Sequence, residues 1–183
     1  MNPADMTLYS GATRGAEEEF GRLAEHYGIQ EINYSFESHP NVRTRGLHEL
    51  SREELEKGDV SLHYVSRLLN RNYTQKGDTF RRVLQTLFHI VNNSREVFVI
   101  GEIQEDQTVK GGTGWGAEFA KICNKTLYNF DQKQNQWFHW KEQQWQSMAQ
   151  PFISESHFAG LGTRFLEDNG RQAIEDLYKA SLG

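Results

Sequence analysis

The stretch "VFVIGEIQEDQTVKGGTGWGAEFAKI", residues 97–122, decides the class of fold. Its start, Val97 to Ile100, is a continuous apolar run, as in a strand that is covered on both faces. A charged loop follows and ends in four glycines within residues 111–116. Helical spacing begins with Ala117. A strand, a glycine loop and a helix in this order form the repeating unit of a parallel sheet wrapped by helices.

The same alternation of strands and helices recurs on both sides of this stretch. Before it, residues 6–10 predict a strand, 16–27 a helix that stops at Gly28, and 31–36 a second strand. Residues 61–73 and 78–94 carry two amphipathic helical patterns. After it, residues 126–130 predict a buried strand and 165–180 a helix. We therefore expect an α/β fold that is Rossmann-like, with a mostly parallel sheet flanked by helices.

Two segments depart from the alternation. Residues 37–59 are polar and predict an insertion or a long connection. Residues 131–150 place Trp137, Trp140 and Trp145 among polar residues, which favours a tryptophan-rich β-hairpin near the C-terminus at the edge of the sheet. An alternative is that one indole stacks on a planar ligand. Nothing else divides the chain, so residues 1–183 are expected to form one domain.

Composition excludes several classes of protein. With 183 residues, 37% of them hydrophobic, the chain can bury a full core. A formal charge of −5 argues against binding to duplex nucleic acid. No apolar run is long enough for a membrane span and no signal peptide is evident, which favours a cytoplasmic location. A single cysteine, Cys123, and scattered histidines predict neither a disulfide framework nor a metal site, and no cofactor is expected.

Two glycine-bearing turns fall where strands end and helices begin. Ligands of open α/β sheets bind at the carboxyl ends of the strands, and free amides at a helix start favour phosphate. Either turn alone is more typical of a tight turn, but the pair in matching positions indicates a nucleotide. The candidate ligand-binding residues are Ser10, Gly11, Ala12, Thr13, Arg14, Gly15, Arg71, Gly101, Gly111, Gly112, Thr113, Gly114, Trp115, Glu118 and Arg164.

Four stretches in order carry a resemblance to a known family. They are "SGATRGAE" (10–17), "GGTGWG" (111–116), "FDQKQNQWFHW" (130–140) and "FAGLGTR" (158–164). Together they resemble the SLOG superfamily of Rossmann-like nucleotide-binding domains, which includes the Lonely-guy phosphoribohydrolases, DprA proteins and sensor domains of bacterial immunity. They are most similar to a branch that is common in phage genomes. The resemblance covers most of the chain.

Departures from the family pattern bear on activity. Ala12 stands where the branch has its second glycine, and Glu17 where it has aspartate. In the Lonely-guy loop, Ala117 replaces the first of two glutamates and leaves only Glu118. The resemblance thus implies a phosphate-binding loop with an incomplete catalytic set. Glu118 is the catalytic candidate only if the chain is an enzyme; the alternative is a surface acid near a helix start.

Two functions follow as hypotheses. The first is a module that binds a cyclic nucleotide or an ADP-ribose-type signal; if phage-encoded, it would act as a sponge for an immune messenger in the host cytoplasm. The second is a hydrolase that cleaves an N-glycosidic or phosphate ester bond in such a ligand. The resemblance also implies a homo-oligomer, a dimer or higher, with the two amphipathic helices at 61–73 and 78–94 as its surface. Alternatively, these helices only cover the sheet.

Overall fold

An eight-stranded sheet organises the protein, and the computed structural model describes residues 1–183. The strand order is β3-β2-β1-β8-β4-β5-β6-β7. The six strands from β3 to β5 run parallel, and β6 and β7 continue the sheet in antiparallel fashion. The strand bounds are β1 (Thr7–Ser10), β2 (Gln30–Ser35), β3 (Leu47–Glu49), β4 (Glu96–Ile100), β5 (Thr126–Asp131), β6 (Gln136–Lys141), β7 (Gln144–Met148) and β8 (His157–Gly162).

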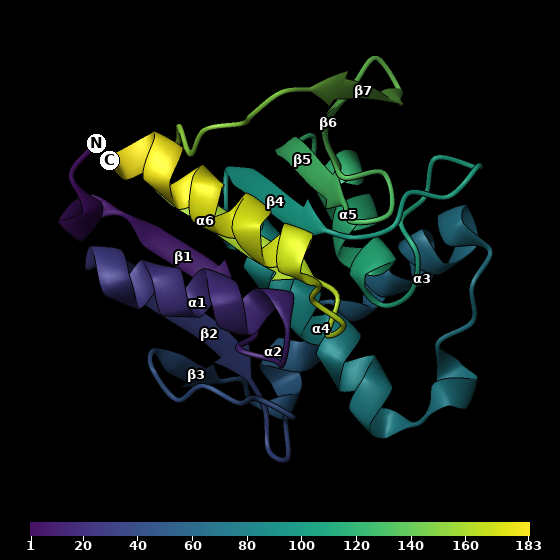
Figure 1. Ribbon diagram of the computed structural model, residues 1–183. Coiled ribbons are helices and arrows are strands. Elements are labelled where there is room, and N and C mark those ends of the chain that lie inside the picture. Colours follow the sequence, from purple (N-terminus) through teal and green to yellow (C-terminus); the bar gives the residue numbers. More distant parts are fainter.

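Helices cover both faces of the sheet, which confirms the predicted α/β, Rossmann-like class. One face carries α1 and α6 side by side, and the other carries α2 to α5 (Figure 1). Each face has its own buried apolar cluster. The helix bounds are α1 (Ala16–Tyr27), α2 (Arg52–Glu56), α3 (Asp59–Leu69), α4 (Asp78–Asn93), α5 (Thr113–Ile122) and α6 (Asp168–Leu182), with short 3-10 turns at Pro3–Asp5 and Thr74–Lys76.

The point where the chain changes direction in the sheet lies between β1 and β4. From β1 the chain passes through α1 to β2 on one side, and from β4 it passes through α5 to β5 on the other. Because α1 and α5 pack on opposite faces, the loops after β1 and β4 diverge there. Such a switch point is where open α/β sheets bind their ligands.

The strand β8 fills this switch point and was not predicted from the sequence. Its sequence, "HFAGLG", has two glycines and so little β-propensity. Close packing explains both of them. A Cβ on Gly160 would run into the ring of Phe20, and one on Gly162 would lie 2.6 Å from the Cβ of Ala16. The glycines therefore let α1 approach the middle of the sheet.

The two irregular segments have defined structures. Residues 37–59 contain β3 and α2, and α2 starts with a capping box between Ser51 and Glu54. The β6–β7 hairpin forms the edge of the sheet, with Trp140 opposite Trp145 and ring centroids 5.2 Å apart. Trp137 is buried in the core. None of the six helices combines the length and apolar character that a membrane crossing requires.

Candidate functional site

Backbone hydrogen bonds join four chain segments at the carboxyl ends of the central strands. The amide of Ala16, at the start of α1, donates to Thr163 O at 2.9 Å, and the amide of Thr163 donates to Ile100 O at 2.9 Å. The amide of Gly101 donates to Phe130 O, at the end of β5, at 3.0 Å. We call the edge formed by the loops after β1, β8, β4 and β5 the rim. All four motif stretches of the sequence contribute to it.

Two residues that the sequence reasoning missed hold the rim together. The buried carboxylate of Asp131 accepts from the amides of Ile103 and Lys133, both at 2.9 Å. The side chain of Gln132 accepts from the Glu167 amide at 2.7 Å and donates to Phe165 O at 3.2 Å. Their signal was present, because an acid and an amide directly after a buried strand are polar groups that need partners.

The first predicted loop, Gly11 to Gly15, wraps around the carboxylate of Glu17. One oxygen of the Glu17 carboxylate accepts from the amide of Thr13 at 3.1 Å and from its hydroxyl at 2.5 Å. Burial raises the pKa of this carboxyl, although the bonds from Thr13 oppose the shift. Ala12 is held at φ 54°, the left-handed region that glycine prefers. A carboxylate from the first turn of α1 thus binds the loop where a phosphate was expected.

Other predicted residues of this loop lie at different depths. The Ser10 hydroxyl is buried and donates to Gly160 O at 2.7 Å, so it faces the sheet. Gly11 is buried as well. Arg14, by contrast, is exposed. Gly15 touches the loop after β8, because a Cβ there would lie 2.5 Å from Thr163 O.

Arg71 clamps the second predicted loop from outside. Its guanidinium donates to Val109 O at 3.0 Å, to Gly111 O at 3.1 Å and to the Gln104 side chain at 2.7 Å. Gly114 lies directly beneath, since a Cβ there would collide with Val109 O. These contacts engage both terminal nitrogens of the half-buried Arg71, so in this structure its side chain shapes the loop.

The exposed end of this loop carries the free amides. Gly111 and Gly112 are exposed, and Thr113 begins α5. The amide of Gly114 donates back to Gly111 O at 3.2 Å, whereas the amides of Gly112 and Thr113 donate to no protein acceptor. These two amides are therefore free at the positive end of a helix. Gly101 packs under Val109 and closes the base of the loop.

Trp115 and Glu118 face away from the free amides. Trp115 is 2% exposed and meets Tyr73 edge-on. The Glu118 carboxylate lies 3.2 Å from the Nζ of Lys121, which in turn sits 3.8 Å from the ring centroid of Trp140. Burial lowers the pKa of Lys121, and the Glu118 charge opposes that shift. The ion pair lies within α5, and the contacts of Lys121 with the rings of Trp140 and Trp145 join this helix to the β6–β7 hairpin.

Free cationic side chains remain at the rim. Arg14 and Arg164 are exposed, and neither takes part in an ion pair. Lys133 and Lys110 both bind Glu102, at 2.7 and 3.1 Å, and their hydrogen bonds lower the pKa of its carboxyl. The two arginines are thus the cations at the rim that have no internal acid. No three His, Cys, Asp or Glu side chains are grouped to hold a metal ion.

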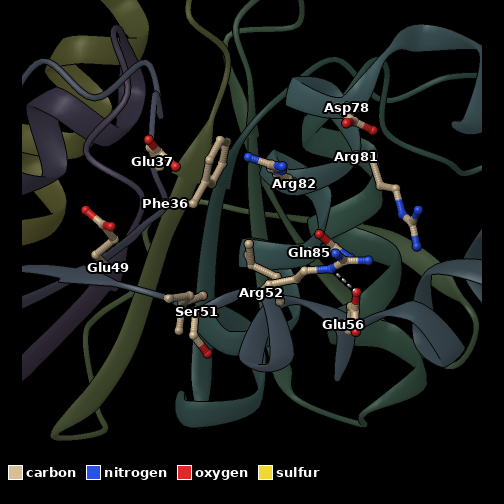
Figure 2. A pocket seen from close by; sticks show the side chains of 12 residues that line it. Phe36, Glu37, Glu49, Ser51, Arg52, Glu56, Asp78, Arg81, Arg82 and Gln85 are labelled. Carbon is tan, nitrogen blue, oxygen red and sulfur yellow. Dashed lines mark hydrogen bonds and ion pairs between the residues drawn. The ribbon is translucent and has the colours of Figure 1, made fainter.

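A large cavity lies elsewhere in the fold. It measures about 560 Å³ and opens between the ends of β2 and β3, α2 and the first turns of α4 (Figure 2). A smaller one of about 180 Å³ lies beside Gly15 among Arg22, Arg43 and Arg171. The loop at Gly111 to Gly114 lines neither. The large cavity is therefore separate from the part of the rim that carries Gly111 to Gly114.

Comparison with known proteins supports the fold. Neither the family models nor the curated proteins give a match. Among solved structures, the chain is similar to a "putative molybdenum carrier protein" from Syntrophus aciditrophicus SB, with a TM-score of 0.56 and 16% sequence identity. The alignment covers 100% of this chain and 98% of that one. At this identity the likeness extends to the Rossmann-like fold.

Proposed function

We propose that the rim binds a nucleotide-derived anion, a cyclic nucleotide or an ADP-ribose-type molecule, and holds it without cleaving it. The observation that carries this proposal is the pair Arg14 and Arg164, two exposed guanidinium groups without an internal acid on loops that touch at Gly15. Guanidinium groups bind phosphate through two parallel hydrogen bonds. The free amides of Gly112 and Thr113 supply a second anion-binding element at the same edge.

The spacing of these two elements favours a ligand with more than one anionic group. A single strand, β8, separates β1 from β4, so these two strands lie about 10 Å apart. A lone phosphate is too small to meet the arginines and the amides at once. A diphosphate or a cyclic dinucleotide reaches both.

Capture is favoured over hydrolysis because the carboxylates near the rim already bind other groups of the protein. Glu118, the only catalytic candidate, is paired with Lys121 on the side of α5 that meets the hairpin. Glu17 is buried and accepts from Thr13, and Glu102 is held by two lysines. Glycosidic cleavage normally employs two carboxyl groups in different roles. The Syntrophus protein is described as a carrier, which also favours binding of the ligand over its chemical conversion.

The biological setting forms part of the proposal. The four motif stretches resemble a phage-associated SLOG branch, so we infer a sponge that removes an immune messenger in the host cytoplasm. The ligand-contacting set reduces to Arg14, Gly111 to Thr113 and Arg164, with the remaining predicted residues, Thr13 among them, shaping the loops. Two copies of the chain would associate through α3 and α4, as the resemblance implies.

The deciding experiment is capture followed by release. Purified protein is mixed with cyclic dinucleotides or with cyclic and linear ADP-ribose, and free ligand is quantified by chromatography before and after heating. We expect depletion in proportion to protein, and return of intact ligand after denaturation. Free base, ribose phosphate or linearised nucleotide formed over many turnovers and abolished in Glu118→Gln would establish the hydrolase alternative. Molybdate, tested in parallel, examines the ligand named for the Syntrophus protein.

Variants locate the site. Gly112→Asp places a negative charge at the free amides and meets only Phe80, at 3.8 Å, so the protein should fold. We expect binding to weaken at least a hundredfold, roughly 3 kcal/mol. Arg14→Gln with Arg164→Gln should weaken it similarly, whereas Arg67→Gln, at an exposed and unpaired arginine on α3, should not. Unchanged affinity in the first two variants would refute the assignment of the site to the rim.

A further inference from the structure

The cavity beside α4 has the size and position of a second binding site. Its 560 Å³ falls within the range of about 300–1,000 Å³ that small-molecule sites occupy. Phe36 and Glu37 reach it from the end of β2, and Glu49 and Leu50 from the end of β3. It thus lies at the carboxyl ends of parallel strands, as ligand sites of α/β sheets do.

The lining of this cavity is rich in charge, and part of that charge is already neutralised. Arg52 pairs with Glu56 at 2.8 Å, and Arg81 pairs with Asp59, which lies outside the lining, at 2.7 Å. Gln85 also donates to Asp59, at 2.7 Å. These pairs neutralise the charges of Arg52 and Arg81 within the protein.

Four charged side chains of the lining take part in no ion pair or side-chain hydrogen bond within the protein. They are the carboxylates of Glu37, Glu49 and Asp78 and the guanidinium of Arg82. Figure 2 shows Glu37 and Glu49 on one side of the cavity, Arg82 near its middle, and Asp78 toward the other side. The unpaired charge therefore sums to −2, with one positive group between acids. A ligand that complements this arrangement carries two cationic groups and one anionic group.

The aromatic side chain of the cavity has no free face for a nucleobase. Phe36 is only 4% exposed. The ring of His39 meets it edge-on at 4.8 Å, and the Arg82 guanidinium lies 6.0 Å from its centroid. A nucleotide would also bring phosphates among three unpaired carboxylates. The cavity consequently disfavours the ligand class that we propose for the rim.

We propose that this cavity binds a basic α-amino acid or a molecule that contains one. Its carboxylate pairs with Arg82, its ammonium group lies between Glu37 and Glu49, and its side-chain cation reaches Asp78. Arginine–carboxylate pairing is bidentate and fixes the orientation of the ligand. The proposal does not depend on the function of the rim, because the two sites share no residue.

Calorimetric titration of the intact protein with L-arginine and L-lysine tests the proposal. We expect one site per chain, bound at least tenfold more tightly than L-glutamine and L-glutamate. Equal affinity for L-glutamine would refute the need for a second cation, and tighter binding of L-glutamate would refute the charge assignment. If neither amino acid gives a binding signal at concentrations up to about 10 mM, the proposal is overturned.

Substitutions assign the binding to this cavity. Glu49→Gln and Arg82→Gln should each weaken L-arginine binding by about tenfold, or 1.4 kcal/mol. Glu53→Gln is the control: Glu53 is an exposed acid of α2 that does not itself line the cavity, so the affinity of this variant should match that of the original protein. Equal loss in Glu49→Gln and Glu53→Gln would indicate a general charge effect and overturn the assignment. Gly112→Asp should leave L-arginine binding unchanged, which separates this site from the rim.

Discussion

Gly15 is the position where the first loop and the loop after β8 touch, and Gly15→Ala tests that contact. Gly15 precedes α1 with φ 96° and ψ −122°, a conformation that residues with a Cβ rarely adopt. An added Cβ would lie 2.5 Å from Thr163 O and 2.6 Å from the Cα of Arg164. Both are backbone atoms, so no side-chain rotation relieves the clash.

The expected destabilisation has two parts. The unfavourable φ contributes about 1–3 kcal/mol, and displacement of the packed backbone contributes about 1–3 kcal/mol more. Gly28→Ala at the other end of α1 is the matched control. Gly28 also has a positive φ, 74°, but an added Cβ there meets nothing within 4 Å. We therefore expect about 4 kcal/mol for Gly15→Ala and about 1 kcal/mol for Gly28→Ala.

Urea unfolding followed by circular dichroism measures both free energies. For a chain of this length, a loss of 4 kcal/mol should also lower the melting temperature by roughly 8–16 °C. If Gly15→Ala is no more destabilising than Gly28→Ala, the two loops are not held in contact. The account of the rim as one connected edge would then be refuted.

Three further changes test other parts of the structure. Because burial raises the pKa of Glu17, the folded protein binds a proton at this carboxyl more readily than the unfolded chain does. The stability of the original protein relative to Glu17→Gln should therefore rise as the pH falls from 7 toward 4.5. If urea unfolding gives the same stability difference between the two proteins at every pH, this prediction is wrong. Arg71→Lys keeps the charge but removes the guanidinium group that donates to Val109 O and Gly111 O. Hydrogen exchange of the loop amides should therefore accelerate, and the free energy of unfolding should fall by about 1–2 kcal/mol. Unchanged exchange would show that Arg71 does not hold the loop in place. Val99→Asp buries an unpaired charge in β4 at a site with 0% exposure and should prevent soluble folding or lower the free energy of unfolding by several kcal/mol; normal melting would place this strand at the surface.

The class of fold was predictable because its strongest signals are local. The run from Val97 to Ile100 and the spacing within 16–27 depend on residues close in sequence, and both elements were found where the sequence placed them. The central strand β8 was not predictable in this way. Its glycines are explained only by Phe20 and Ala16, more than 130 residues earlier in the chain, which pack against them.

The candidate site shows the same limit for individual side chains. An arginine near a glycine loop is the expected phosphate ligand, yet Arg71 donates to carbonyl groups 38 and 40 residues away. Likewise, Glu17 accepts from its own loop. Which partner a charged group finds depends on tertiary distances that the sequence does not specify. The helical spacing of Trp115 and Phe119 did, however, contain a signal that Trp115 belongs to the core.

The central position of β8 has a consequence for how the chain folds during synthesis. All seven other strands leave the ribosome before β8, yet β8 alone joins the half-sheet β3-β2-β1 to the half-sheet β4-β5-β6-β7. Until Gly162 emerges, β1 and β4 each expose an unpaired edge that readily pairs with other chains. Nascent chains released before this point should therefore aggregate or require a chaperone, and completion of the rim coincides with insertion of the last strand.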